Sequence, residues 1–267
     1  LYNMVDSIVV GNYVGKLALA AVGTGFPIIF MLSAMFIGLG LGATVLISQY
    51  IGAGDMSNVQ RTAQTIYTAM ILGSIPISVI GILLSKPILL LINTPPDALP
   101  MANTYMRIIF LGMVGSFGYN VNAGILQGFG DSKSSLLFLA IATVINIVLD
   151  LTFVLVFHWD VAGVAIATII AQAFSWIFGI FYMKKKYEVL NFPIFKFKFD
   201  KEIFNKIVKI GLPTGIQQTL FSIGIMSMQS LVNSYGSDFI AGFNAANKID
   251  TFAFMPVQSF SNAITTF

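Results

Sequence analysis

The sequence contains eight long stretches that are apolar and almost free of charge. A helix needs about 20 apolar residues to cross the hydrocarbon core of a bilayer, and all but the first of these stretches reach that length. They cover residues 1–14, 18–51, 62–85, 108–128, 136–157, 161–183, 210–235 and 239 onward. Because 57% of the residues are hydrophobic and only 9% are charged, a soluble globular domain is excluded. We predict an all-α integral membrane protein, a polytopic helical bundle.

The connections between these stretches are short, and short loops join antiparallel neighbours into a compact bundle. The exception is residues 184–209, which hold eight of the fourteen Lys and Arg residues and which the positive-inside rule places in the cytoplasm. Helical spacing over residues 201–209 predicts a helix on the inner membrane surface. The long stretch at 18–51 exceeds one bilayer thickness, and its glycine run at 38–42 offers a bending point.

The basic segment divides the chain into three parts: a six-helix lobe at 1–183, a linker at 184–209 and the first two helices of a second lobe at 210–267. An offset of 221 residues aligns Gly15 and Ala20 with Gly236 and Ala241, each pair at the turn between a first and a second predicted helix. Internal repeats of this kind are common in transporters. On this register the second lobe would continue beyond residue 267, so we expect a fragment of a longer chain.

Two carboxylates, Asp6 and Asp150, interrupt the predicted spans of the first lobe. An unpaired charge inside a bilayer costs several kcal/mol, so an ionisable residue there indicates a functional site, with a structural polar network as the alternative. Asn146 lies one helical turn before Asp150 and can reach the same ligand. Thr168 lies in the next span, and for both Asn146 and Thr168 a structural role is the alternative, because Asn and Thr in spans often only join helices by hydrogen bonds.

Other polar residues are candidates for a substrate cleft. Lys248 and Asp250 interrupt the last stretch, and since they lie two residues apart on a helix they need separate partners. Asn120 and Asn122 lie late in the fourth stretch, where helix packing explains them as well as a cleft does. The chain has no cysteine, one histidine and no paired-acid motif, which argues against an intramembrane enzyme. No basic patch interleaved with aromatic residues indicates nucleic acid.

Nine short motifs are spread along the whole chain. They are Tyr2-Asn3-Met4-Val5-Asp6, Val14-Gly15-Lys16-Leu17-Ala18-Leu19-Ala20-Ala21, Ser48-Gln49-Tyr50-Ile51-Gly52-Ala53-Gly54-Asp55, Leu126-Gln127-Gly128-Phe129-Gly130-Asp131-Ser132-Lys133, Asn146 to Asp150, Gly163 to Gln172, Gly211-Leu212-Pro213, Ile249-Asp250 and Met255-Pro256. In order and spacing they resemble the multidrug and toxic compound extrusion (MATE) transporters, most closely the prokaryotic DinF-like branch. The resemblance implies two six-helix lobes related by pseudo-twofold symmetry, of which this chain holds the first lobe and the opening of the second.

The resemblance also implies an activity, the efflux of amphipathic organic cations in exchange for protons or sodium ions by alternating access. In the DinF-like branch the ion site falls on residues that match Tyr2, Asp6, Asn146, Asp150 and Thr168. The sodium-coupled NorM-like branch has a glutamate near Phe221, where this chain has no acid, which favours the first-lobe site.

Further expectations concern partners and location. The partners implied are the lipid bilayer and small cationic drugs, with no nucleic acid, no cofactor and no metal except sodium at Asp6, Asn146, Asp150 and Thr168. We expect a monomeric transporter in the plasma membrane whose basic linker faces the cytoplasm, and no enzymatic activity. A flippase for lipid-linked precursors in the same superfamily is the nearest alternative, although it would need a more cationic cavity than this lobe offers.

Overall fold

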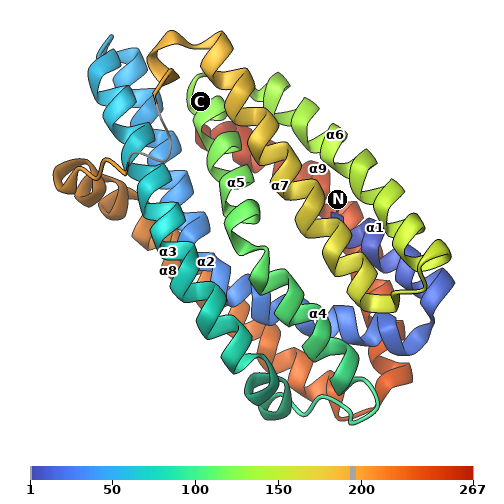
Figure 1. Ribbon diagram of the computed structural model, residues 1–267. Helices are drawn as coiled ribbons and strands as arrows, with labels where there is room; N and C mark the ends of the chain where they lie inside the picture. The colour runs from blue at the N-terminus through green and yellow to red at the C-terminus, as the bar shows by residue number, and fades with distance from the viewer. Residues whose placement is uncertain (1, 193–196, 267) are drawn as a thin grey trace.

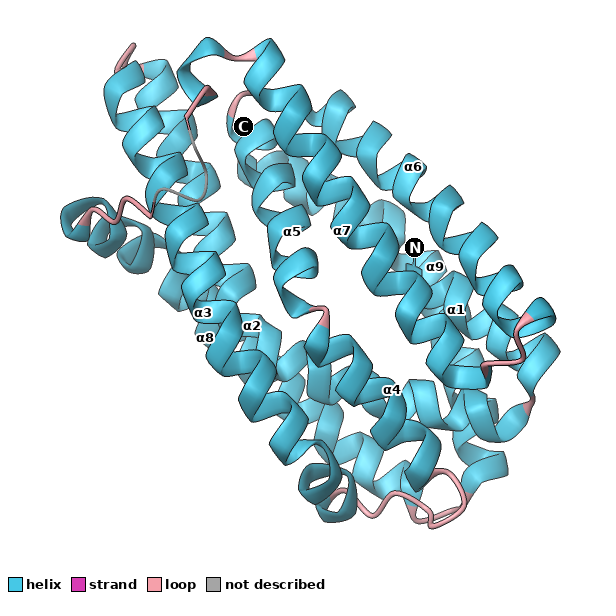
Figure 2. Cartoon of the chain, in the orientation of Figure 1, coloured by secondary structure: helices cyan, strands magenta, loops and turns pink. Residues whose placement is uncertain are grey.

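The computed structural model describes the backbone of residues 2–192 and 197–266. Of these, the side chains of residues 2–4, 248, 252, 255, 258 and 261–266 lie outside the described part. The described residues form helices and loops without a strand, which confirms the predicted all-α fold (Figure 2). The helices are α1 (Tyr2–Val9), α2 (Lys16–Gly52), α3 (Met56–Leu91), α4 (Leu99–Leu111), α5 (Met113–Gly128), α6 (Ser132–Leu151), α7 (Asp160–Lys186), α8 (Lys201–Asn233) and α9 (Ser237–Thr266), with π-helical turns η1 (Val10–Val14) and η2 (Thr152–Val156) and the 3-10 turn η3 (Glu188–Leu190).

Four helices within the described ranges are long and apolar enough to cross a membrane: α2, α3, α6 continued by η2, and α7. A fifth candidate is the pair α4 and α5, which is bent by 55° at a short break. The stretch predicted as one span at 108–128 is therefore divided between α4 and α5. The break falls at Gly112, where a Cβ atom would collide with Ile169 of α7. The other three predicted spans are helical but are not among these candidates for crossing a membrane, because α1 is too short and α8 and α9 carry more polar residues.

The glycine run in α2 serves helix contact. α2 is unbroken through residues 38–42 and packs along α8. A Cβ atom on Gly38 would lie 2.5 Å from the carbonyl oxygen of Gly211 and 2.6 Å from the amide nitrogen of Gly215. Gly42 meets the backbone of α8 in the same way at Ile207. Small residues at these positions let the two backbones approach directly, as they do in many membrane helix pairs.

The surface helix predicted over residues 201–209 is not a separate element, because α8 begins at Lys201 and runs without interruption to Asn233. Asp200 caps it: its carboxylate accepts hydrogen bonds from the backbone N–H of Glu202 (3.0 Å) and of Ile203 (3.1 Å). In Figure 1 the first turns of α8 project beside α3 before the helix runs behind α2 and α3.

A second capping aspartate, Asp131, ties α6 to the end of α7. It accepts hydrogen bonds from the backbone N–H of Ser134 (3.2 Å), from Lys186 Nζ (2.6 Å) and from the Tyr187 hydroxyl (2.9 Å). Burial raises the pKa of Asp131, but these bonds and the Lys186 charge outweigh burial and lower the pKa to about 2. The carboxylate therefore stays ionised and holds the start of α6 and the end of α7 together.

Two large apolar clusters lie in the interior, beside a small third one around Val232 and Ile240. The larger joins α2, α3, α4, α5 and α7 with the start of α8 around Met106, Phe110 and Leu126. The smaller packs η1, the start of α2, η2 and the start of α7 around Val10, Val154 and Val164. This second cluster matters for function because it surrounds the ends of the two helices that carry Asp6 and Asp150.

Candidate ion-binding site

Three helices bring four of the predicted site residues together. Asp6 comes from α1, Asn146 and Asp150 from α6, and Thr168 from α7, and none is more than 5% exposed. The Thr168 hydroxyl donates to the carboxylate of Asp6, at 3.1 Å to Oδ2 and 3.3 Å to Oδ1. Asn146 Nδ2 lies 3.3 Å from Thr168 Oγ1 and 3.4 Å from Asp150 Oδ1. The four side chains thus form one chain of contacts from Asp6 to Asp150.

The two carboxyl groups are also close enough to interact directly, so they are not independent charges. Two oxygens in the group, Asn146 Oδ1 and Asp150 Oδ2, are buried without a hydrogen-bond partner within the described structure. A buried acceptor without a partner is costly. A proton or a small cation is the kind of partner that a buried carboxylate oxygen such as Asp150 Oδ2 can take.

The local sequence explains why these side chains meet. Asn146 and Asp150 are four residues apart, so they share the face of α6 that packs on α7. The two helices that carry the site carboxylates each continue into a π-helical turn, α1 at Val10 and α6 at Thr152. π turns inside α-helices are frequently found at functional sites. Here both lie within a few residues of a site carboxylate, and they contact each other.

Tyr105 of α4 also belongs to the site, and sequence reasoning missed it. Its ring is 2% exposed, and its hydroxyl lies beside the carboxyl group of Asp6. A buried tyrosine in a spanning helix needs a partner for its hydroxyl, which is the only signal that pointed to it. Because the ring also packs with the apolar cluster around Val10 and Val164, it closes one side of the site.

The donor set suits a hard monovalent cation or a shared proton. It offers carboxylate, amide and hydroxyl oxygens, the ligands that hard cations prefer. In the part of the chain that the structure describes, no group of three or more His, Cys, Asp or Glu side chains is arranged for a metal ion. Two carboxylates, an amide and a hydroxyl are the described groups that this site offers to a small cation or a shared proton.

The remaining predicted residues lie elsewhere. Asn122 is buried, accepts a short hydrogen bond from the Tyr67 hydroxyl and donates to the Trp176 carbonyl oxygen at 2.8 Å. Asp250 is exposed on α9. The side chains of Tyr2 and Lys248 lie outside the described part, so their roles in the site stay predictions.

Asn120 lines a cavity of about 200 Å³ between α2, α3 and α5. Its walls are apolar, and Phe36 stacks on Phe117 with ring centroids 4.6 Å apart. Thr44 and Gln127 supply the other polar lining groups. Asn122 is not among the lining residues, so the structure separates the two asparagines into a lining residue and a helix-bridging residue.

This fold, with four described helices able to cross a membrane and a buried group of polar side chains between them, is that of a multi-pass helical membrane protein. A family model described as MatE matches residues 1–152, more than half of the chain. The chain therefore belongs to the MATE family of transporters.

Individual relatives agree. The chain is 32% identical over 266 residues to the "Probable multidrug resistance protein YpnP" of Bacillus subtilis, which covers 99% of this chain and 59% of that protein. It is 22% identical to a protein named "FAD transporter" from Shewanella oneidensis, over 100% of this chain and 60% of that protein. The chain thus spans about three-fifths of the length of these relatives.

Solved structures of the family superpose closely. An inward-facing MATE multidrug transporter matches with a TM-score of 0.88 at 27% identity, over 96% of this chain and 58% of that chain. The MATE multidrug transporter DinF-BH, solved as a complex with a small molecule, matches with a TM-score of 0.89 at 26% identity, over 97% of this chain and 58% of that chain. The predicted family and all-α membrane fold are confirmed, and the chain covers 58% of each of these two structures.

Proposed function

We propose that this chain couples ions to the efflux of amphipathic organic cations, acting as an antiporter for protons or sodium ions. The observation that supports it best is the meeting of Asp6 and Asp150 in a fully buried site, in which Asn146 Oδ1 and Asp150 Oδ2 have no hydrogen-bond partner within the described structure. Two carboxylates in that environment bind a proton or a cation in preference to standing alone. The relatives named as multidrug resistance proteins support the choice of substrate class.

The coupling would work through alternating access. A ligand shifts a conformational equilibrium only through a difference in its affinity for the two states. Binding of an ion at Asp6 and Asp150 would neutralise the site in one state, and its release would make the site able to attract a cationic substrate in the other. The chain's own residues supply this difference, because only groups that change charge can respond to the ion gradient.

The location follows the same proposal. The protein would sit in the plasma membrane as a monomer, with the basic residues 184–209 in the cytoplasm and no enzymatic role. The four helices that can span a membrane, and the bent fifth pair, support a multi-pass arrangement.

The test is transport by the full-length natural protein in vesicles, with a cationic rhodamine dye as the probe and FAD as a competing anionic probe. We expect Asp150→Asn and Asp6→Asn to abolish efflux driven by a proton or sodium gradient. Asp238→Asn, on an aspartate that is 83% exposed, is the matched control and should keep full efflux. Separate proton and sodium gradients identify the coupling ion. Full gradient-driven efflux by Asp150→Asn would rule out the proposed role, and uptake of FAD but not the dye would overturn the substrate class.

A further inference from the structure

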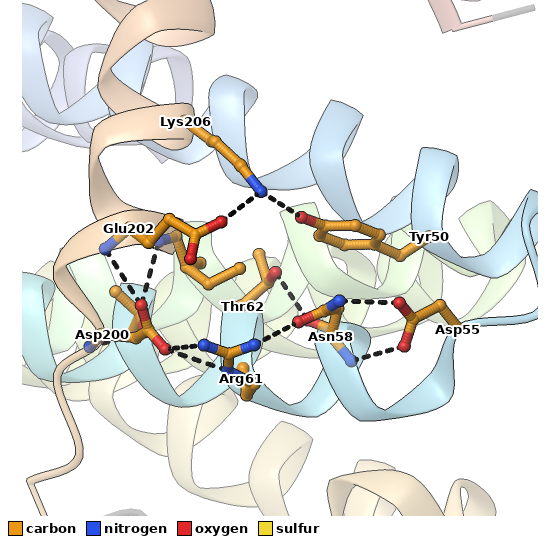
Figure 3. A network of polar contacts seen from close by, with 10 residues as sticks. Tyr50, Asp55, Asn58, Arg61, Thr62, Asp200, Glu202 and Lys206 are labelled. Atoms are coloured by element: carbon orange, nitrogen blue, oxygen red, sulfur yellow. Dashed lines mark hydrogen bonds and ion pairs between the residues drawn. The ribbon is translucent and has the colours of Figure 1, made fainter.

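The segment that enters α8 is bound to the N-terminal part of α3, which the proposed orientation places at the cytoplasmic side. Arg61 Nε donates to Asp200 Oδ2 at 2.9 Å, and the Thr68 hydroxyl donates to the carbonyl oxygen of Lys198 at 3.0 Å. The backbone N–H of Asp200 donates to Thr65 Oγ1 at 3.3 Å. Figure 3 shows the start of α8 beside α3, with Arg61 reaching across to Asp200. These bonds fix residues 198–203 at a defined level along α3.

That level corresponds to the inner edge of the hydrocarbon core. α3 has 36 residues, hence a length of about 54 Å, and exceeds the core by about 24 Å. Between Arg61 and Lys86 it carries no charged residue, a length of about 36 Å that matches the core with little to spare. Thr65 therefore lies close to the depth at which lipid headgroups meet the acyl chains.

At this depth the segment presents exposed aromatic rings. Phe197 is 53% and Phe199 49% exposed, and Phe199 packs on Phe204 with ring centroids 4.9 Å apart. On the opposite face of the first turns of α8, Ile203 and Ile207 are buried in the larger apolar cluster. The segment thus has two apolar sides. Ile203 and Ile207 face the interior of the protein, and the aromatic rings of Phe197 and Phe199 face outward.

Three exposed lysines accompany these rings. Lys198, Lys201 and Lys209 form no ion pair within the described ranges of the chain, whereas neighbouring cations are neutralised. Arg61 pairs with Asp200, and Lys206 binds Glu202 at 2.8 Å. Asp200 and Glu202 are therefore already occupied, and the three lysines are left as a net positive surface beside the aromatic patch.

We propose that residues 197–209 are a docking surface for the headgroups of anionic phospholipids in the inner leaflet. Phe197 and Phe199 would insert at the boundary of headgroups and acyl chains, where aromatic side chains are enriched. Lys198, Lys201 and Lys209 would contact lipid phosphates, with their aliphatic stems along the apolar surface. The rigid attachment to α3 holds both groups at the required depth, so little ordering is left for binding to impose. This inference does not depend on the transported substrate.

The test measures binding to the full-length protein in detergent, with three probes: short-chain phosphatidylglycerol, short-chain phosphatidylcholine and inorganic phosphate. Each lysine near the surface should strengthen binding of the anionic lipid by about fivefold. The variant Lys198→Gln/Lys201→Gln/Lys209→Gln should therefore lose most of a roughly 100-fold preference for phosphatidylglycerol over phosphatidylcholine. Phe197→Ala/Phe199→Ala should weaken both lipids alike and leave that preference unchanged.

The matched control removes two lysines at a distance from the surface, Lys16→Gln/Lys86→Gln, and should keep the preference. Unchanged melting temperatures in neutral detergent show that each variant is folded. Retention of the full lipid preference by the triple variant would overturn the proposal. Binding of inorganic phosphate as tight as that of phosphatidylglycerol would also overturn it, because the surface would then be a phosphate site and not a lipid site.

Discussion

The contact between α2 and α8 allows a sharp test of the packing. An alanine at position 38 would place its Cβ atom 2.5 to 2.7 Å from backbone atoms of Gly211 and Gly215. Carbon atoms in real structures do not approach closer than about 3.0 Å, so the helices must separate by at least about 0.5 Å. Backbone atoms cannot rotate aside as a flexible side chain could.

Such overpacking lowers the free energy of unfolding by about 1–3 kcal/mol. The variant Gly40→Ala is the control that separates this clash from the effect of alanine itself. Gly40 lies on the same helix between Gly38 and Gly42, yet nothing lies within 4 Å of its Cβ position. Replacing glycine by alanine in a helix has an intrinsic effect of about 1 kcal/mol. Since both variants share that effect, the difference between Gly38→Ala and Gly40→Ala should be the clash itself, about 2 kcal/mol.

The assay is equilibrium unfolding of the full-length protein in mixed micelles, extended to a double-mutant cycle. Gly211→Ala presses on the same contact from the other side, 2.8 Å from the carbonyl carbon of Gly38. Once the helices have separated for one alanine, the second should cost less, so the double variant should be more stable than the sum of the singles predicts by at least about 0.5 kcal/mol. Equal stability of Gly38→Ala and Gly40→Ala, or strict additivity in the cycle, would refute the close backbone contact.

Two further predictions concern polar contacts. The lowered pKa of Asp131 should contribute no more than about 2 kcal/mol to the free energy of unfolding, and this contribution is present above about pH 4 and lost as the pH falls toward 2. Asp131→Asn should remove this pH dependence of the unfolding midpoint. An unchanged pH profile in the variant would contradict the prediction. Tyr67→Phe should destabilise the protein by about 1–3 kcal/mol, because it leaves Asn122 Oδ1 buried without a hydrogen-bond donor. Tyr235→Phe, which changes an exposed ring, is the control. Equal unfolding midpoints for the two variants would argue against the hydrogen bond between Tyr67 and Asn122.

Much of the candidate site could be predicted because part of it is local in sequence. Asn146 and Asp150 share a helix face through their spacing of four residues, and a buried acid in an apolar stretch is conspicuous by its cost. Asp6 and Thr168 were linked to them only by the family resemblance, since nothing local joins helices that lie so far apart in the sequence. The structure brings all four together, but their role in ion coupling stays a prediction.

What could not be predicted depends on how helices pack. Tyr105 lies on α4, before the bend between α4 and α5, and Gly112 at that bend packs closely on Ile169 in α7. The glycine run at 38–42 was interpreted as a bending point, although its cause is a neighbouring backbone in α8. In both cases the deciding atom lies far away in the sequence, and a glycine alone does not tell which role it has.

The contacts of α8 indicate which helices would move together in the proposed antiporter. The sequence division assigns α8 to the second lobe, yet it is bound to first-lobe helices at three depths: Arg61 to Asp200, Gly38 to Gly211, and Asn233 Nδ2 to the Ile92 carbonyl oxygen at 2.8 Å. Ligand binding shifts a conformational equilibrium by about 1–3 kcal/mol. Two hydrogen bonds of about 1 kcal/mol or more each, together with a packed helix interface, exceed that amount. We therefore expect α8 to keep its contacts and move with the first lobe. A cross-link between cysteines placed at positions 93 and 230, whose present side chains lie 3.3 Å apart, should leave efflux intact, and loss of efflux would place the moving boundary between α8 and the first-lobe helices instead.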